Sequence, residues 1–467
     1  MLSFYDDGIR LCDGVTRREW LRVGGLGALS LSLPALLHAR RTQGAVDGGG
    51  SPFGKAKACI LVNLTGGPPQ HETWDPKPGA PVEIRGEFRP IASSLPGLDV
   101  CELMPQVAQL AHKHAVLRAV ATGDNAHSSS GYQMLTGRPH IPLNVESARV
   151  GAPNDWPCVA AMVKWLRRRE PGLPASVVLP EHIWNDGNFP WPGQDGGFLG
   201  RTADPWLIHC DPSSPDFKPP DLAFPPDMSA PRFQGRQRLL EQVDRRLSEV
   251  ERRAAVARYQ LDAVQALDLL QSEKSRTAFD IAREPPAVRE RYGMSRYAQS
   301  LLLARRLVEA GVSLVQINWT RIKDAPNQGG WDTHQVHNQS LKTLLMPLMD
   351  RAYSALIEDL EQRGMLAETL VVWSGEFGRT PRFNPQAGRD HWGPVFSIAL
   401  TGGGIREGVV HGESDRDGAQ PHSGKVTPAD VAATIFHTLG YDPRTELHDP
   451  VGRPFPLSQG EVIRQIL

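Results

Sequence analysis

The sequence predicts an α/β fold with a mostly parallel central sheet, helices on both faces and one inserted segment. Three observations support this prediction. Short, continuous apolar runs are typical of strands buried on both faces of a parallel sheet. Helical patterns lie between several of these runs, and such alternation is typical of a parallel sheet covered on both sides. Hydrophobic residues make up 40% and charged residues 22% of the 467 residues, which is ordinary for a chain with a large buried core.

The first predicted strand covers residues 58–64, an apolar run that ends before two glycines and two prolines. Because glycine and proline interrupt regular structure, they mark the end of this strand. Further strands are predicted at residues 115–120, 175–179, 313–317, 369–373 and 395–400. Helices are predicted at residues 105–112, 157–168, 297–310, 341–362 and 428–439. Together these elements predict one large domain at residues 46–467.

Residues 1–45 differ from the rest of the chain and are predicted to be a twin-arginine signal peptide. Arg17 and Arg18 precede an uncharged run of Gly, Ala, Leu and Ser at residues 23–37, which a basic pair at Arg40 and Arg41 follows. A membrane-spanning helix needs about 20 apolar residues, so this run is too short and too rich in glycine to be one. The prediction implies export by the twin-arginine translocase to the periplasm or another extracytoplasmic compartment.

The overall charge and the cysteines exclude several classes of function. The formal net charge is −1, from 51 basic and 52 acidic side chains, so nucleic acid is not an expected partner. Four widely spaced cysteines remain after the signal, at positions 59, 101, 158 and 210, without a Cys-x-x-Cys pair. This spacing does not support a structural zinc site, whereas one or two disulfides are compatible with export.

A proline-rich segment interrupts the alternating pattern, and an insertion is predicted at about residues 180–290. Its later part, residues 236–282, has apolar positions at helical spacing. This favours a helical hairpin packed on the core over a partner-binding coiled coil, because strict heptads are not sustained. Trp184, Trp191 and Trp206 lie near its start. Aromatic rings stack on sugars, so a carbohydrate-binding site is one interpretation, and a small core within the insertion is the other.

Carboxylates and imidazoles gather where predicted strands end, which is the edge at which open α/β sheets bind ligands. They follow the strands at 58–64, 313–317 and 369–373, and they precede the strand at 395–400. The candidate ligands are His71, Asp75, Asp332, His334, Glu376 and His391. Divalent cations take oxygen and nitrogen ligands from several directions, so these distant segments are expected to share a cation. Taken singly, each motif is also explained by a surface salt bridge or a helix cap. Glu376 would then pair with Arg379, and His337 would lie on the solvated face of the helix that follows.

The segment after the strand at 115–120 contains Asn125, His127 and three serines that begin with Ser128, and a helical pattern follows. Ser and Asn are good helix caps, and a helix N-terminus stabilises an anion through its free N–H groups. This pattern predicts a site for a tetrahedral phosphate or sulfate, and a capped turn without a ligand is the alternative.

These residues resemble a known group of proteins. The tetrapeptide at 135–138 resembles the end of the sulfatase nucleophile motif, and residues 426–440 resemble the closing helix of the same superfamily. A wider set is similar to the bacterial family called domain of unknown function 1501, within the alkaline phosphatase/sulfatase-like superfamily. The set consists of Gly66-Gly67, Trp74-Asp75-Pro76-Lys77-Pro78, Tyr292-Gly293, residues 304–312, Gly330-Trp331-Asp332-Thr333-His334, Glu376-Phe377-Gly378-Arg379-Thr380 and Asp390-His391-Trp392.

The superfamily resemblance implies an alkaline phosphatase-like fold and a two-metal site. Zinc is the first choice of cation, with calcium and manganese as alternatives. Asp332 and His334 would then contribute to one metal and Glu376 to the other, and His391 would complete the set. The nucleophile position falls on His127, with Ser128 beside it, so these two residues are the catalytic candidates.

The sequence also departs from the superfamily pattern. The first strand lacks the usual aspartate near Leu64-Thr65, and Phe377 stands where a ligand histidine is common. His71 and Asp75 would substitute for the missing ligands, or the site would hold a single metal, with direct attack by water at the metal. Gly131 occupies the place of an arginine that formylglycine sulfatases need, which disfavours that chemistry.

Two functions are therefore expected from the sequence. The first is an exported metal-dependent hydrolase of phosphate or sulfate esters, with a polysaccharide as one candidate carrier of the ester. The alternative is a non-catalytic binding or assembly subunit that keeps a sulfatase-like fold.

Overall fold

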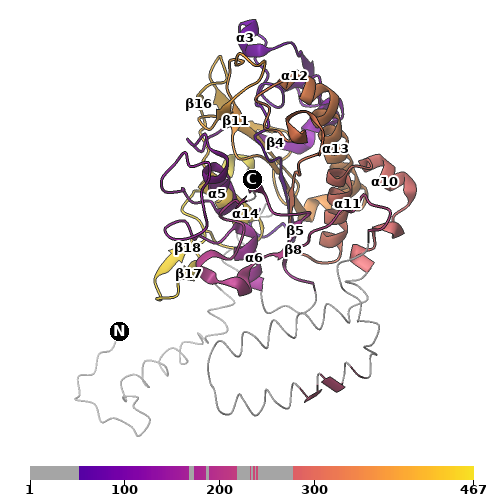
Figure 1. The fold of residues 1–467 in the computed structure, drawn as a ribbon, viewed down its shortest axis with the longest axis vertical. Helices are drawn as coiled ribbons and strands as arrows, with labels where there is room; N and C mark the ends of the chain where they lie inside the picture. Colours follow the sequence, from indigo (N-terminus) through magenta and orange to yellow (C-terminus); the bar gives the residue numbers. More distant parts are fainter. Residues whose placement is uncertain are drawn as a thin grey trace, which may run out of the picture. The chain divides into compact units, whose positions relative to one another are not determined.

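An eight-stranded sheet forms the centre of the molecule (Figure 1). The computed structural model describes residues 52–167, 173–185, 189–217 and 277–467, with isolated positions between 232 and 239. The strand order is β14-β4-β13-β10-β1-β9-β5-β8. The strands are β1 Ala58–Asn63, β4 His114–Val120, β5 Ser176–Leu179, β8 Trp206–Leu207, β9 Leu314–Asn318, β10 Thr369–Ser374, β13 Phe396–Thr401 and β14 Val409–His411.

The sheet is mostly parallel, which confirms the predicted fold class. Only β13 runs against its neighbours, because it pairs antiparallel with both β10 and β4 while the other pairs are parallel. All six predicted strands are present, and their boundaries are shifted by one residue at most. The edge strands β8 and β14 were not predicted, since two or three residues carry too little periodicity to be recognised.

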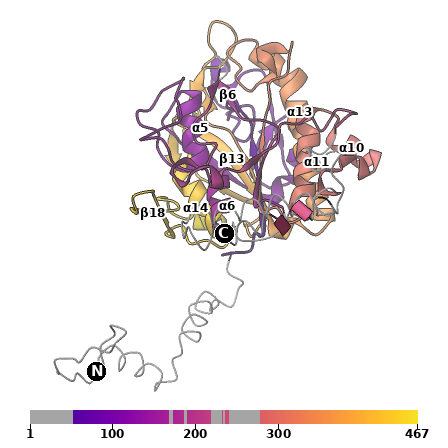
Figure 2. The same cartoon turned by 60° about the horizontal axis from the view of Figure 1, so that its bottom comes forward.

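Helices cover both faces of the sheet, as Figures 1 and 2 show from two directions. Successive strand residues point to opposite faces, so Ile60 and Val62 of β1 face one layer, and Cys59 and Leu61 face the other. The first layer contains α4 (Pro105–Leu110), α11 (Arg296–Glu309) and α13 (Met346–Gln362). The second contains α6 (Val159–Arg167) and α14 (Pro428–Thr438), and α5 (His127–Thr136) packs against α14.

Local sequence explains where α14 begins. Thr427 caps α14 by accepting a hydrogen bond from Asp430 N, and the Asp430 carboxylate accepts one from Thr427 N in return. The helix predicted at 341–362 starts earlier, as α12 (His337–Ser340), and continues through a π turn (Leu341–Leu345) into α13.

Smaller elements surround the main sheet. They are the strand pairs β2 (Pro90–Ala92) with β3 (Asp99–Cys101), β6 (Trp184–Asn185) with β7 (Phe189–Pro190), β11 (Gly378–Arg379) with β12 (His391–Trp392), β15 (Glu413–Ser414) with β16 (Pro421–Ser423), and β17 (Glu446–His448) with β18 (Pro454–Pro456), and the helices α3 (Val82–Arg85) and α10 (Pro286–Tyr292). Short 3₁₀ turns lie at 111–113, 197–199, 201–203, 281–283, 326–329, 366–368 and 464–466. The first part of the predicted insertion thus contains the β6–β7 hairpin and the edge strand β8.

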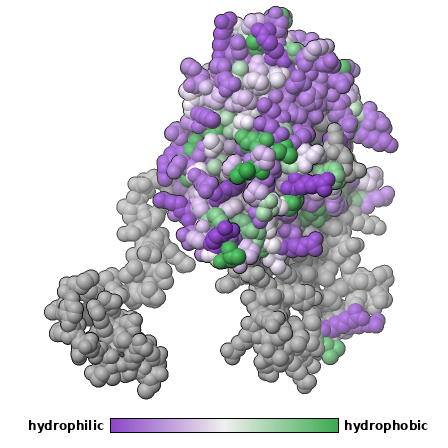
Figure 3. Space-filling view, turned by 60° about the vertical axis from the view of Figure 1, so that its left-hand side comes forward, coloured by the Kyte–Doolittle hydropathy of each residue, from purple (hydrophilic) through white to green (hydrophobic). Residues whose placement is uncertain are grey.

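Some predictions lie outside the described residues. The predicted signal peptide at 1–45 does so entirely, and the predicted helical hairpin at 236–282 does so for the most part. The four cysteines that the structure describes are all free thiols, so the suggested disulfides are absent among them. Within the described ranges, no helix combines the length and the apolarity that a bilayer span requires. The face that carries α5 is largely hydrophilic, with hydrophobic side chains gathered in small areas (Figure 3).

Candidate metal centre

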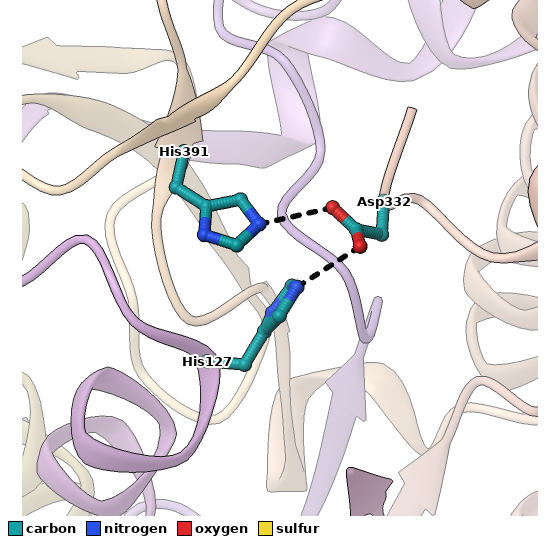
Figure 4. A group of neighbouring side chains, drawn as sticks. All are labelled: His127, Asp332 and His391. Carbon is teal, nitrogen blue, oxygen red and sulfur yellow. Dashed lines mark hydrogen bonds and ion pairs between the residues drawn. The ribbon is translucent and has the colours of Figure 1, made fainter. Parts of the chain in front are cut away.

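Side chains from three separate segments meet at the carboxyl edge of the parallel strands. Asp332 and His334 follow β9, and His127 is the first residue of α5, which follows β4. His391 precedes β13 in sequence. Because β13 is antiparallel to the other strands, its amino end lies at the edge where the others have their carboxyl ends. The reversed strand therefore brings His391 to the same edge as Asp332 and His127 (Figure 4).

Asp332 is the centre of this group of side chains, because three imidazoles face its carboxylate. His127 Nε2 lies 3.2 Å from Asp332 Oδ2. His334 Nε2 and His391 Nε2 lie 3.0 Å and 3.1 Å from Asp332 Oδ1, and these two nitrogens are 2.9 Å apart. One ligand atom each from His127, Asp332 and His391 lie within 4.8 Å of one another, a spacing that suits a shared cation. We call the four residues His127, Asp332, His334 and His391 the metal cluster.

The opposite ring nitrogen of each histidine is fixed by an oxygen acceptor. His127 Nδ1 donates to Glu376 Oε1 at 2.7 Å, and His334 Nδ1 donates to Asp390 Oδ1 at 2.7 Å. His391 Nδ1 donates to the main-chain oxygen of Asn125, also at 2.7 Å. When Nδ1 carries the proton of a neutral imidazole, Nε2 presents a lone pair. In the neutral form of each ring, all three imidazoles would therefore direct a lone pair toward the Asp332 carboxylate.

This arrangement fits a cation. Two imidazole lone pairs and a carboxylate oxygen lie about 3 Å from one another, and acceptors that face each other repel unless a positive charge lies between them. Protonation relieves part of this repulsion in the protein alone, and a divalent cation relieves it at all of these atoms together. Metal-binding histidines typically donate their second N–H to a carboxylate or a main-chain carbonyl, as these three do.

The pKa values reflect the same electrostatics. Burial alone would lower the pKa of His127, but hydrogen bonds with Asp332 and Glu376 raise it to about 9. Burial, together with the charge of His127, lowers the pKa of His391 to about 4. Burial would raise the pKa of Asp332, but the buried Arg379 guanidinium, 2.5 Å away, holds it far below its usual range. The cluster thus contains a permanent anion and an imidazole that stays neutral at neutral pH.

Three of the predicted ligands lie within the metal cluster: Asp332, His334 and His391. Glu376 lies one step outside it, because its Oε1 accepts hydrogen bonds from His127 Nδ1 and from Gly66 N at 2.8 Å. The position expected for the nucleophile, His127, supplies one of the facing imidazoles instead.

The other candidate residues have different partners. His71 Nε2 hydrogen-bonds the Asp417 main-chain oxygen at 2.8 Å. Asp75 forms ion pairs with Lys77 and Arg118 and accepts a hydrogen bond from Ser414. Both predicted substitute ligands, His71 and Asp75, therefore bind partners outside the metal cluster.

Ser128 is also directed away from the metal cluster. Its buried hydroxyl bonds the main-chain oxygens of Val145 and Glu146 and accepts from Ala148 N. The sequence could not show this, because the partners belong to the loop that follows α5. These bonds fix that loop and hold the Ser128 hydroxyl against it.

The predicted anion site at the start of α5 is occupied by the protein's own carboxylate. Glu146 Oε2 accepts a hydrogen bond from His127 N at 2.8 Å. Ala126 holds the N-cap position and provides no side-chain cap, while Ser129 Oγ donates to Asp124 at 2.9 Å. The helix terminus therefore orients His127 through Glu146, and the main-chain N–H of His127 is not free to bind an external anion.

The residues that orient the ligands were not identified from the sequence. Asp390 and Asn125 fix two rings, and only their places beside His391 and His127 hinted at such a role. Arg379 was considered as a partner of Glu376, but it pairs with Asp332 and donates to the main-chain oxygens of Gly66 and Gly67.

Close backbone packing explains the glycine beside the cluster. Gly66 has φ +117°, and a Cβ there would lie 2.4 Å from Asp332 N. Only glycine allows this approach without displacing Asp332.

Aromatic rings wall one side of the cluster, and a cavity opens on another. Phe377 is fully buried and stacks on His391 with ring centroids 4.6 Å apart, and Trp191 stacks on His127 at 5.9 Å. The cavity has a volume of about 790 Å³ and reaches His127, Asp332 and His334. Its remaining walls include Thr65, Glu146, Glu181, His182, Trp184, Trp319 and Arg321.

The fold and this cluster define an α/β protein with a candidate cation centre at the carboxyl edge of its sheet. The chain belongs to the family described as protein of unknown function DUF1501, which matches residues 56–467. A search of curated proteins found no match.

Several solved structures are similar in fold at low sequence identity. The PsFucS1 sulfatase from Pseudoalteromonas sp. is 12% identical with a TM-score of 0.38, over 83% of this chain and 68% of that one. The phosphonate monoester hydrolase SpPMH from Silicibacter pomeroyi is 12% identical with a TM-score of 0.36, over 88% and 76%. The C-terminal periplasmic domain of EcEptC from Escherichia coli, a complex with Zn, is 11% identical with a TM-score of 0.37, over 89% and 96%. At sequence identities and TM-scores this low, no residue role is transferred from these structures to this chain.

Proposed function

We propose that the protein is a metal-dependent hydrolase of phosphate or sulfate esters, with one divalent cation held by His127, Asp332, His334 and His391. Zinc is the proposed cation, because histidine nitrogens and carboxylate oxygens are common protein ligands of zinc. Calcium and manganese prefer oxygen-rich sites, which makes them the less suitable alternatives. The convergence of three oriented imidazoles on the Asp332 carboxylate is the observation that carries the proposal.

The residues of the centre have distinct roles in this proposal. Asp332 provides the negative charge that offsets the cation, and Arg379 fixes its carboxylate. Glu376 and Asp390 hold the rings of His127 and His334 in the ligand tautomer. A bound divalent cation supplies Lewis-acid activation of the ester and of the attacking water. With Ser128 engaged elsewhere, direct attack by water is the proposed route, and a covalent intermediate on Ser128 is not.

The cavity supports a substrate larger than a simple ester. Its volume of about 790 Å³ is within the range of cavities that bind drug-sized ligands. Trp184 lies on its wall with 37% of its surface exposed, so its ring can stack on a sugar face. Glu181 and Asn327 add polar groups that could bind hydroxyls. These features support an ester carried by a polysaccharide or oligosaccharide.

One observation favours the alternative, a non-catalytic binding or assembly subunit. The cavity wall contains the carboxylates Glu146 and Glu181 and one guanidinium, Arg321. Carboxylates repel an anionic ester, and the proposed cation has to overcome this repulsion. A cation centre without turnover would identify the binding function.

Metal analysis and turnover test the proposal directly. Protein purified without chelator is expected to contain about one zinc per chain and to hydrolyse an aryl phosphate or an aryl sulfate. Asp332→Asn is expected to lose both zinc and turnover. Asp75→Asn, which changes a buried carboxylate outside the metal cluster, is expected to keep both. Absence of stoichiometric metal would refute the hydrolase proposal, and zinc without turnover on either ester would favour the binding subunit.

We also propose export of this domain. Residues 1–45 would direct the chain to the twin-arginine translocase, leaving residues 46–467 as the mature protein, with an insertion at about 180–290. Arg17 and Arg18 provide the test, because changing both to lysine is expected to retain the protein in the cytoplasm. Unchanged export of that variant would refute this assignment.

A further inference from the structure

A buried carboxylate outside the cavity connects the two loops that carry most of the cluster. The first loop, residues 332–337, contains Asp332 and His334, and the second, residues 384–391, contains His391. Glu72, only 1% exposed, lies between these ligand loops. Its Oε1 accepts a hydrogen bond from Arg389 Nη2 of the second loop at 2.5 Å. Its Oε2 lies 3.3 Å from Nε2 of His337, the last residue of the first loop.

Each partner of Glu72 is tied to a residue next to a ligand. His337 Nδ1 lies 2.6 Å from Oγ1 of Thr333, which stands between Asp332 and His334. Arg389 N donates to Thr333 O at 3.1 Å. Thr333 is therefore held by His337 through its side chain and by Arg389 through its main chain. The residues that link Glu72 to the two loops, His337 and Arg389, are both fully buried.

The conformation of the first loop shows why it needs support. Val336 has φ 43°, an unfavourable conformation for a β-branched residue that persists only where the surroundings enforce it. His337 N donates to Ala387 O at 3.0 Å, so the strained turn is attached to the second loop. A Cβ on Gly388 would lie 1.9 Å from His334 O, which shows how closely the two ligand loops pack.

The Glu72–Arg389 pair is ionised and isolated from solvent. Burial would raise the pKa of Glu72, but Arg389 and His337 lower it to about 2. Arg389 also donates to Ile84 O at 2.7 Å and to Thr380 O at 3.0 Å. Glu72 does not line the cavity beside the metal cluster. A buried ion pair contributes little net stability compared with apolar packing, so stability alone does not account for it.

We infer that Glu72 is a positioning residue, which holds the two ligand loops at the separation that a cation requires. This inference rests on the proposed metal centre, and it assigns a role to a residue that contacts neither the cation site nor the substrate cavity. Outer residues that orient metal ligands typically change metal affinity by 10–100-fold when they are mutated.

The test compares two buried glutamates. Glu72→Gln removes the charge between the ligand loops, and Glu284→Gln is the matched control. Glu284 is also buried, at 7% exposed, and pairs with Arg305 at 2.8 Å and with Arg306. Zinc affinity is measured by competition with a chromophoric chelator, the Co²⁺ absorption spectrum reports ligand geometry, and thermal unfolding in excess chelator reports stability.

Both variants are expected to unfold at a lower temperature without metal. Only Glu72→Gln is expected to lose zinc affinity, by about 10–100-fold, and to alter the Co²⁺ spectrum. If Glu72→Gln does not fold, His337→Gln removes one arm of the same connection and is expected to act in the same direction.

Two results would overturn the role of Glu72 while leaving the metal centre intact. One is wild-type zinc affinity and an unchanged Co²⁺ spectrum in Glu72→Gln. The other is an equal loss of affinity in Glu284→Gln, which would show a general effect of destabilisation. Failure of the wild-type protein to bind zinc at all would instead refute the proposed metal centre, and the positioning role with it.

Discussion

Replacing Glu376 with glutamine distinguishes a residue that orients a ligand from one that binds the cation. Glu376 Oε1 accepts hydrogen bonds from His127 Nδ1 at 2.7 Å and from Gly66 N at 2.8 Å. The amide oxygen of glutamine can accept the same two bonds, so the His127 ring keeps its place and only the negative charge is lost.

The expected effect of Glu376→Gln on cation binding depends on this geometry. Loss of an orienting carboxylate lowers zinc affinity by about 10–100-fold, which corresponds to about 1.4–2.7 kcal/mol of binding free energy. If Glu376 were itself a metal ligand, as the family resemblance implied, Glu376→Gln would lower zinc affinity by more than about 100-fold. In the metal-free protein, the pKa of His127 is expected to fall from about 9, because the hydrogen bond with Glu376 helps to raise it.

Isothermal titration with zinc measures the affinity, and NMR titration of the His127 ring measures the pKa. Glu146→Gln is the control, since Glu146 accepts a hydrogen bond from the main-chain N–H of His127. An unchanged zinc affinity in Glu376→Gln would refute the reasoning. So would an equal change in Glu146→Gln, because the loss would then depend on total charge and not on the ring hydrogen bond.

Three further predictions concern backbone packing, pH and the excluded nucleophile. Gly66→Ala would place a Cβ 2.4 Å from Asp332 N at a residue with φ +117°. We therefore expect a loss of about 1–3 kcal/mol in unfolding free energy and weaker zinc binding. The control Gly79→Ala, whose Cβ would have no atom within 4 Å, is expected to change neither. The pKa of His127 is raised from 6.5 to about 9, so its stabilising contribution is complete below pH 6.5 and is lost as the pH rises through 9. Thermal unfolding in chelator is expected to show this decline for the wild type and not for His127→Gln, and parallel curves would contradict it. Ser128→Ala is expected to lower the unfolding free energy by about 1–3 kcal/mol with turnover unchanged, and abolished turnover in a folded variant would restore Ser128 as the nucleophile.

The buried Arg379 illustrates what sequence could not predict about the site. Its sequence position beside Glu376 suggested an ion pair between those two residues. The folded chain instead directs Arg379 to Asp332, 47 positions away, and main-chain oxygens of Gly66, Gly67 and Arg389 accept hydrogen bonds from its other N–H groups. Hydrogen-bond partners of this kind come from the ends of other strands, so they cannot be predicted from the residues next to Arg379 in the sequence.

The sequence by itself determined the six longer strands of the main sheet, the main helices around it and the edge of the sheet at which carboxylates and imidazoles gather. Apolar runs and helical periodicity depend on neighbouring residues along the chain, so the boundaries of β1 and α14 were predictable to within one residue. The motifs around Asp332, His334 and His391 also pointed to three residues of the cluster, since carboxylates and imidazoles have few reasons to gather at one edge of a sheet.

Only the tertiary structure decided how these groups face one another. The reversal of β13 brings His391 to the cluster, and Glu376 turns to the His127 ring. His337 lies buried against Glu72 and not on a solvated helix face, the alternative that its sequence position had left open. Each outcome depends on the direction of a side chain relative to a partner far away in the sequence. Such directions are set when the whole sheet assembles, because burial forces every polar atom to find a partner among the segments that meet there.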